Sequence, residues 1–232
     1  DVDSKNVPAR LRYAEIYLND KRYDEVSKKV DEILKINPRS HEGLFLKGRL
    51  HLEKREYNEA INLFQSYLRD NPKSYLGHYL LGLAHLGNGD IQQAKAEIVE
   101  AVKINPQWEE ARLRLADIYL NTGAYDLARE EAQAVLKKSP KSIQAHLIIG
   151  NAHLNRKEIA KALQSFEEVI RIAPQNALGY YQKGRALLAW KKEKEALIQF
   201  EKALSIQPNF LEPLHLISAV YIHQKAYKKA IE

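Results

Sequence analysis

Hydrophobic residues recur along this chain with the spacing of amphipathic helices, and short polar turns separate the helical segments. The pattern has a fixed period, which is marked by a proline that returns at a constant interval: Pro38, Pro72, Pro106, Pro140, Pro174 and Pro208. Proline lacks a backbone N–H and disfavours a helical conformation in the residue before it, so each of these positions predicts a helix end. Each period is therefore expected to hold two helices.

The period divides the chain into repeats at residues 7–40, 41–74, 75–108, 109–142, 143–176, 177–210 and a partial repeat at 211–232. Residues 1–6 are expected to be the tail of a preceding repeat or a linker. The eighth residue of every repeat is small: Ala14, Gly48, Gly82, Ala116, Gly150, Gly184 and Ser218. The twentieth is alanine in all but the first repeat, which has Val26. Small side chains at two fixed helical positions predict that the paired helices pack closely.

The turns agree with this division. Gly89 and Gly123 stand where the first helix of a repeat is expected to end in a left-handed residue. Two residues after the recurring proline stands a side chain that can cap the next helix: Ser40, Ser74, Ser142 and Asn176. A single hairpin buries too little apolar surface to be stable alone, so the repeats are expected to stack on their neighbours.

These repeats resemble the tetratricopeptide repeat (TPR) family, whose pattern has small eighth and twentieth residues, an aromatic residue or His at the eleventh, a large twenty-fourth residue and a proline at the thirty-second. The resemblance covers Val7 to Ile231, as six full repeats and a truncated seventh. It implies an all-α fold, a right-handed α-α superhelix built of antiparallel helix pairs. It also implies a non-catalytic scaffold for protein–protein interaction.

Composition narrows the function classes. The net charge of the 232 residues is +6, but the full repeats each lie between −1 and +3 and the charges alternate in sign along the helices. That pattern is typical of a solvated helical face, so nucleic-acid binding is not expected. With no cysteine, disulfides and thiolate metal sites are excluded.

The two ends of the sequence and its hydropathy do not decide the cellular compartment of the protein. No apolar run is long enough to span a membrane and no basic-then-apolar start is present, so we expect neither membrane insertion nor a signal peptide in this sequence. The chain starts without Met and stops within a helical pattern, which favours a piece of a longer protein. A soluble fragment of either the cytoplasm or the periplasm fits this pattern.

Candidate chemistry is sparse. His78 with His85, and His146 with His153, are seven residues apart, whereas metal-binding pairs on a helix are four apart. These histidines stand at the fourth and eleventh positions, where packing side chains are expected. No nucleophile motif and no phosphate loop are present. We therefore expect no catalytic residues, no metal site and no cofactor.

The resemblance also implies a binding groove on the concave side, lined by the second, fifth, sixth, ninth, twelfth and thirteenth residues of each repeat. In the first repeat these positions include Leu11, Arg12 and Glu15. The candidate groove residues of the later repeats are Phe45, Leu46, Arg49, Leu76, Tyr79, Leu80, Leu83, Leu113, Arg114, Asp117, Leu147, Asn151, Tyr181 and Arg185. Members that grip chaperone C-terminal carboxylates have a basic fifth residue, whereas here this residue is apolar, aromatic or His.

The segment from Tyr75 to Gly89 has no charged residue. One interpretation is an exposed apolar patch of Leu76, Tyr79, Leu80 and Leu83 that binds a partner. The other is a central repeat that is simply more apolar. At the level of the whole protein, the first hypothesis is a scaffold that binds a peptide or helix of a partner protein. The alternatives are a self-assembling homo-oligomer and the regulatory arm of a larger protein.

Overall fold

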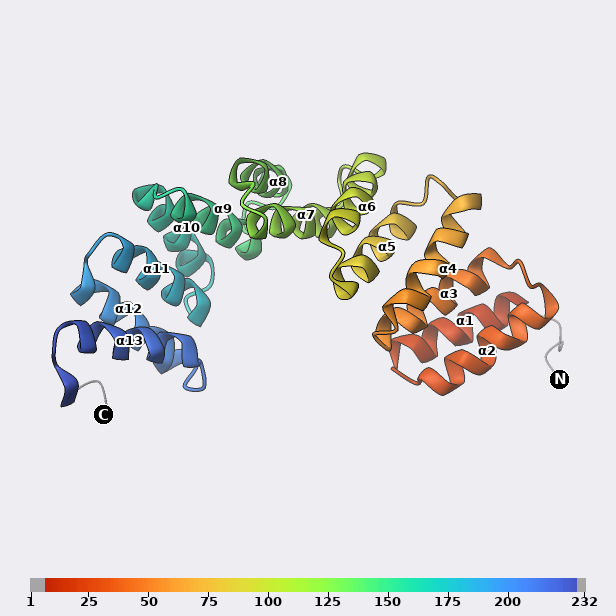
Figure 1. Ribbon diagram of the computed structural model, residues 1–232, viewed down its shortest axis with the longest axis horizontal. Coiled ribbons are helices and arrows are strands. Elements are labelled where there is room, and N and C mark those ends of the chain that lie inside the picture. Colours follow the sequence, from red (N-terminus) through yellow and green to blue (C-terminus); the bar gives the residue numbers. More distant parts are fainter. Residues whose placement is uncertain (1–6, 229–232) are drawn as a thin grey trace. The chain divides into compact units, whose positions relative to one another are not determined.

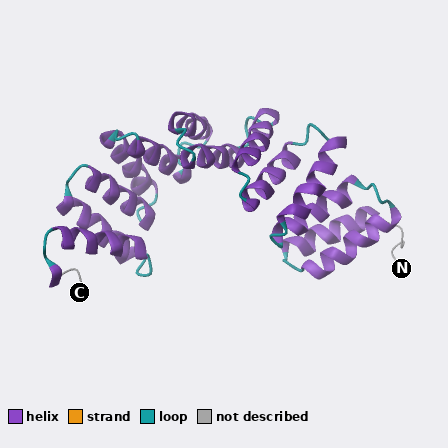
Figure 2. Ribbon diagram, viewed as in Figure 1, coloured by secondary structure: helices purple, strands orange, loops and turns teal. Residues whose placement is uncertain are grey.

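The computed structural model describes residues 7–228, and helices joined by short turns make up this part of the chain (Figures 1 and 2). No strand occurs within these residues. The helices are α1 (Val7–Asn19), α2 (Tyr23–Ile36), α3 (His41–Glu53), α4 (Tyr57–Asp70), α5 (Tyr75–Asn88), α6 (Ile91–Ile104), α7 (Glu109–Asn121), α8 (Tyr125–Lys138), α9 (Ile143–Asn155), α10 (Ile159–Ile172), α11 (Ala177–Ala189), α12 (Glu193–Ile206) and α13 (Leu211–His223).

The helices follow the period of the sequence. The first helix of a repeat begins at its first residue, and the second helix begins at its seventeenth. The two helices of a repeat pack against each other as a hairpin, as α1 does with α2 and α11 with α12. The exact repeat boundaries stay a prediction. Residues 1–6, which were predicted to be the tail of a preceding repeat or a linker, lie outside the described residues. The same holds for residues 229–232 of the seventh repeat.

Local chemistry sets the helix ends as expected. The side-chain oxygens of Ser40, Ser74, Ser142 and Asn176 each accept a hydrogen bond from the backbone N–H three residues later. The residue before the recurring proline leaves the helical conformation, as Asn37 does with φ −137° and ψ 97°. Caps and prolines therefore separate one hairpin from the next.

The fifteenth residue of every repeat has a left-handed backbone. Gly89 and Gly123 have φ +89° and +81°, which confirms the prediction for these two turns. The other five repeats place a long basic residue in this conformation: Lys21, Arg55, Lys157, Lys191 and Lys225. A side chain with a Cβ atom is strained there, because Cβ approaches the following carbonyl oxygen. The turn geometry is thus imposed by hairpin packing and not by residue preference.

The chain divides into two compact units, residues 1–111 and 112–232, and each has its own buried clusters. In the first unit, Phe64 is fully buried and a Cβ atom placed at Gly48 would lie 2.8 Å from its ring. In the second unit, Phe166 and Phe200 are fully buried in one cluster with Ala162, Ala186 and Ala196. The small eighth and twentieth residues therefore allow the large twenty-fourth residue to fill the space between paired helices.

Candidate functional site

The predicted groove residues differ widely in exposure. Leu76 is 38% exposed and Arg114 is exposed, whereas Leu46 and Tyr79 are each only 2% exposed. The remaining candidates are all partly buried: Phe45, Arg49, Leu80, Leu83, Leu113, Asp117, Leu147, Asn151, Tyr181 and Arg185. Whether these residues bind a partner stays a prediction.

Of the two interpretations of the apolar segment, the one that places Tyr79 in an exposed patch is wrong for this residue, which is buried. Its ring centroid lies 4.5 Å from that of Trp108, and its hydroxyl donates a 3.0 Å hydrogen bond to Glu110 Oε1. Trp108, the last residue of the same repeat, also contacts Tyr75 at 5.2 Å. The assignment of groove residues by their position in the repeat did not predict that Trp108 covers Tyr79. Trp108 follows the second helix of the repeat and belongs to neither helical pattern.

Leu46 was also expected in the groove lining, and most of its surface is instead buried. It belongs to a core cluster with Ala14, Leu18, Val26 and Val30 of the preceding hairpin. This sixth residue of its repeat therefore joins two hairpins, and only its remaining edge reaches the pocket described next.

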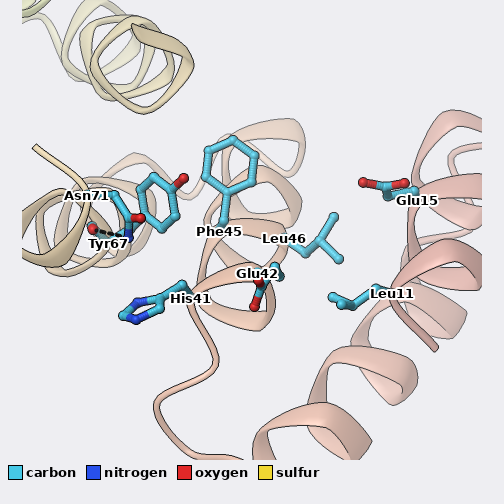
Figure 3. A pocket seen from close by; sticks show the side chains of 8 residues that line it. All are labelled: Leu11, Glu15, His41, Glu42, Phe45, Leu46, Tyr67 and Asn71. Carbon is cyan, nitrogen blue, oxygen red and sulfur yellow. Dashed lines mark hydrogen bonds between the residues drawn. The ribbon is translucent and has the colours of Figure 1, made fainter. Parts of the chain in front are cut away.

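A pocket of about 220 Å³ lies between α1, α3 and α4 of the first unit (Figure 3). Its lining consists of Leu11, Glu15, His41, Glu42, Phe45, Leu46, Tyr67 and Asn71. In Figure 3, Leu11 and Glu15 stand on the α1 side, opposite Tyr67 and Asn71. Leu11, Glu15, Phe45 and Leu46 are at predicted groove positions. The same position count would also find Glu42, whereas His41, Tyr67 and Asn71 fall outside the pattern.

Aromatic packing forms one wall of this pocket. The rings of Phe45 and Tyr67 have centroids 4.9 Å apart at an interplanar angle of 47°. The Asn71 amide, at the end of α4, donates a 3.1 Å hydrogen bond to the Tyr67 carbonyl. Phe45 also meets the buried Phe64 at 5.9 Å. The wall is thus anchored in the core of its own hairpin, and a ligand would meet a preformed surface.

Two of the polar side chains that line the pocket, Glu15 and Glu42, are acidic. Glu15 and Glu42 are exposed, and Ser40 Oγ donates a 3.2 Å hydrogen bond to Glu42 Oε2. His41 Nδ1 lies 3.6 Å from Asp70 Oδ2, outside the lining. No lysine or arginine is among the residues that line the pocket.

In the second unit, two polar groove candidates, Asp117 and Asn151, form hydrogen bonds within the chain. Gln144 Nε2 donates a 3.1 Å hydrogen bond to Asp117 Oδ2. Burial raises the pKa of Asp117, while this hydrogen bond and Arg114 act in the opposite direction. Asn151 donates to the Leu147 carbonyl at 3.0 Å. These side chains are therefore held in place before any ligand arrives.

The histidines stand in packing positions. His85 is 8% exposed and lies 3.3 Å from Asp90, and His153 is 9% exposed and lies 2.7 Å from Glu158. The packing role predicted for this eleventh position is confirmed. Within residues 7–228, no group of three or more His, Asp or Glu side chains could hold a metal ion. Over the same range, no helix is both long enough and apolar enough to cross a membrane.

Comparisons with known proteins agree with the helix pattern. Family models described as tetratricopeptide repeat match residues 27–75, 45–107, 79–143, 113–177 and 177–210. A comparison with curated protein sequences finds no match.

Solved structures share the fold. A tetratricopeptide repeat protein from Parabacteroides merdae superposes with a TM-score of 0.81 at 15% identity, covering 97% of this chain and 89% of that one. YrrB, described as a TPR protein with an unusual peptide-binding site, has a TM-score of 0.67 at 18% identity, covering 81% and 96%. MamA from Desulfovibrio magneticus RS-1 has a TM-score of 0.65 at 20% identity, covering 70% and 92%. The predicted fold class, an all-α solenoid of paired helices, is thereby confirmed.

Proposed function

Because this chain belongs to the tetratricopeptide repeat family, we propose that it is a non-catalytic scaffold that binds a peptide or helix of a partner protein. A fold shared by many proteins does not by itself identify a function, so the proposal depends on a site. The pocket between α1, α3 and α4 is the observation that carries it.

Two independent features support this site. The position count of the family places Leu11, Glu15 and Phe45 in a groove, and the same three side chains line a pocket. The pocket also has the composition of a binding site, since a rigid aromatic wall and apolar side chains are combined with a few polar groups. Among similar folds, YrrB is described as having a peptide-binding site.

The partner segment is an extended peptide or one face of an amphipathic helix. A pocket of about 220 Å³ accommodates one or two side chains, not a whole domain. The remaining contacts come from partly buried residues along the groove, such as Arg49 and Leu83. The binding energy would then be concentrated at Phe45 and Tyr67, where the partner side chain loses the most water.

The proposal is tested with peptides selected from a phage-displayed library of random sequences, using the purified chain as bait. The variant Leu11→Trp fills the pocket and is expected to weaken binding of the selected peptides by about tenfold. The control Ile198→Trp adds the same ring at a position of α12 that is 60% exposed. Isothermal titration measures both. Equal affinities for the two variants, or the absence of selected peptides, would contradict the proposal.

Self-assembly is a second candidate, favoured by the outer face of α1. Tyr13 and Ile16 are 53% and 49% exposed. The residues at these two positions of the third repeat, Leu81 and Ala84, are 2% and 0% exposed, because α4 precedes and packs against their helix.

The face of α1 encloses a hollow of about 300 Å³ lined by Ala9, Arg12, Tyr13 and Ile16. In the self-assembly hypothesis, the end of another copy of the chain packs on this face of α1, as one repeat packs on the next. Light scattering over a dilution series tests the idea. An oligomer that dissociates in the Tyr13→Glu/Ile16→Glu variant supports self-assembly, whereas a monomeric wild-type chain excludes it.

A further inference from the structure

The pocket between α1, α3 and α4 contains two carboxylates, and neither a lysine nor an arginine lines it. Within residues 7–228, neither Glu15 nor Glu42 forms an ion pair, and Glu42 accepts a hydrogen bond only from Ser40. Several other glutamates of the first unit are paired at short distances, such as Glu32 with Arg10 at 2.8 Å and Glu97 with His78 at 2.7 Å. In a chain of net charge +6, this pocket is a local excess of negative charge.

The aromatic wall adds to the same preference. The faces of Phe45 and Tyr67 carry negative electrostatic potential, and a cation placed over such a face is attracted by about 0.5–1 kcal/mol at an exposed site. The wall and the carboxylates belong to three different helices, but all of them border one pocket (Figure 3). Two kinds of group that attract cations thus converge on one space.

We propose that this pocket receives the side chain of an arginine or lysine on the partner segment. The inference rests on the proposed function, because it names the partner chemistry of the same site. The methylene stem packs on Leu11 and on the aromatic wall of Phe45 and Tyr67, and the charged end lies near Glu15 and Glu42. Long basic side chains suit such a place, since they bury the stem while the head group keeps polar partners.

Other occupants fit less well. An apolar side chain would remove water from Glu15 and Glu42 without replacing its hydrogen bonds, and that is unfavourable. An acidic side chain would meet like charge. A metal ion would lack ligands, because no suitable group of His, Asp or Glu side chains exists within the described residues.

The test begins with the selected peptides and the unaltered chain. We expect the selected sequences to share a lysine or arginine, and replacement of that residue by glutamine to weaken binding to the wild-type chain by about tenfold, as two exposed ion pairs would. Binding is also expected to weaken as salt is raised. This step needs no protein variant, so a folding defect cannot affect it.

Protein variants then locate the effect. Glu15→Gln/Glu42→Gln should cause the same loss of about tenfold and reduce the salt dependence. Glu201→Gln, an exposed carboxylate of α12 without an ion pair in the described part of the chain, is the control and should bind as the wild type does. Glu15→Lys/Glu42→Lys should prefer a peptide in which the shared basic residue is glutamate.

The outcomes separate this inference from the proposed function. If the Leu11→Trp variant binds the peptides more weakly, but the Glu15→Gln/Glu42→Gln variant binds them as tightly as the wild type does, the inference is overturned and the groove proposal stays intact. Peptides that are insensitive to Leu11→Trp would overturn both.

Discussion

His153 Nδ1 lies 2.7 Å from Glu158 Oε2, across the turn that joins α9 to α10. The same pair of positions is occupied by His51 and Glu56, at 2.6 Å. In each pair the backbone N–H of the acidic residue also donates to the carbonyl of the histidine. A side-chain contact and a backbone hydrogen bond therefore close the same turn.

Acid is expected to weaken this turn. Hydrogen bonds from His153, then Arg156 and Lys161, lower the pKa of Glu158 to about 2 from the usual 4.5. A carboxyl group with a lowered pKa stabilises the fold fully above the unfolded pKa, and this stabilisation is lost as the pH falls from about 4.5 to 2. The Glu158→Gln variant should be less stable at pH 7, and its difference from the wild type should shrink over this range. Urea unfolding at several pH values measures it, and a difference that stays constant down to pH 2 would disprove it.

The close contact between Gly48 and Phe64 predicts that no larger residue is tolerated at position 48. In Gly48→Ala the new Cβ atom would lie 2.8 Å from the Phe64 ring, so the ring or the helix must shift. We expect a loss of about 1–3 kcal/mol in the free energy of unfolding. Adding Phe64→Leu makes room, so the double variant should lose less than the sum of the two single changes. Additive losses in urea unfolding would show that the two positions are not coupled.

The left-handed turn residues predict a stabilising change. Lys157 has φ +61°, and its replacement by glycine relieves the Cβ strain, so we expect a gain of about 0.5–1 kcal/mol. Gly123→Lys, the reverse change at the same position of another repeat, should destabilise by a similar amount. Lys161→Gly, within α10, is the control and should cost about 1 kcal/mol. Thermal unfolding ranks the three variants, and a destabilised Lys157→Gly variant would contradict the strain argument.

The burial of Tyr79 predicts that its removal affects stability first. Tyr79→Ala leaves a cavity beside Trp108 and a loss of about 3 kcal/mol is expected. Leu76, three residues earlier and 38% exposed, is the matched control, and Leu76→Ala should cost less than about 1 kcal/mol. Chemical unfolding of both variants checks the contrast. Similar small losses would mean that the Trp108 cover contributes little.

Much of the fold could be predicted because its determinants act over a few residues. Pro38 ends a helix through its own ring, and Ser40 caps the next helix through the backbone N–H of Gly43. These effects recur in repeat after repeat, so the period alone yields the helix pairs. The strained turn at Lys157 was missed, since lysine has no local preference for a left-handed backbone.

The order of amino acids was enough to establish the helices, the glycine turns at Gly89 and Gly123 and the family, because each depends on neighbours along the chain. Which groove candidates reach solvent became clear only from the packing of the helices. Tyr79 is covered by Trp108, which follows the next helix along the chain, and the pocket beside Phe45 needs Glu15 from one helix and Tyr67 from another. Exposure depends on what packs against a residue in space, and a count of positions within one helix does not contain that information.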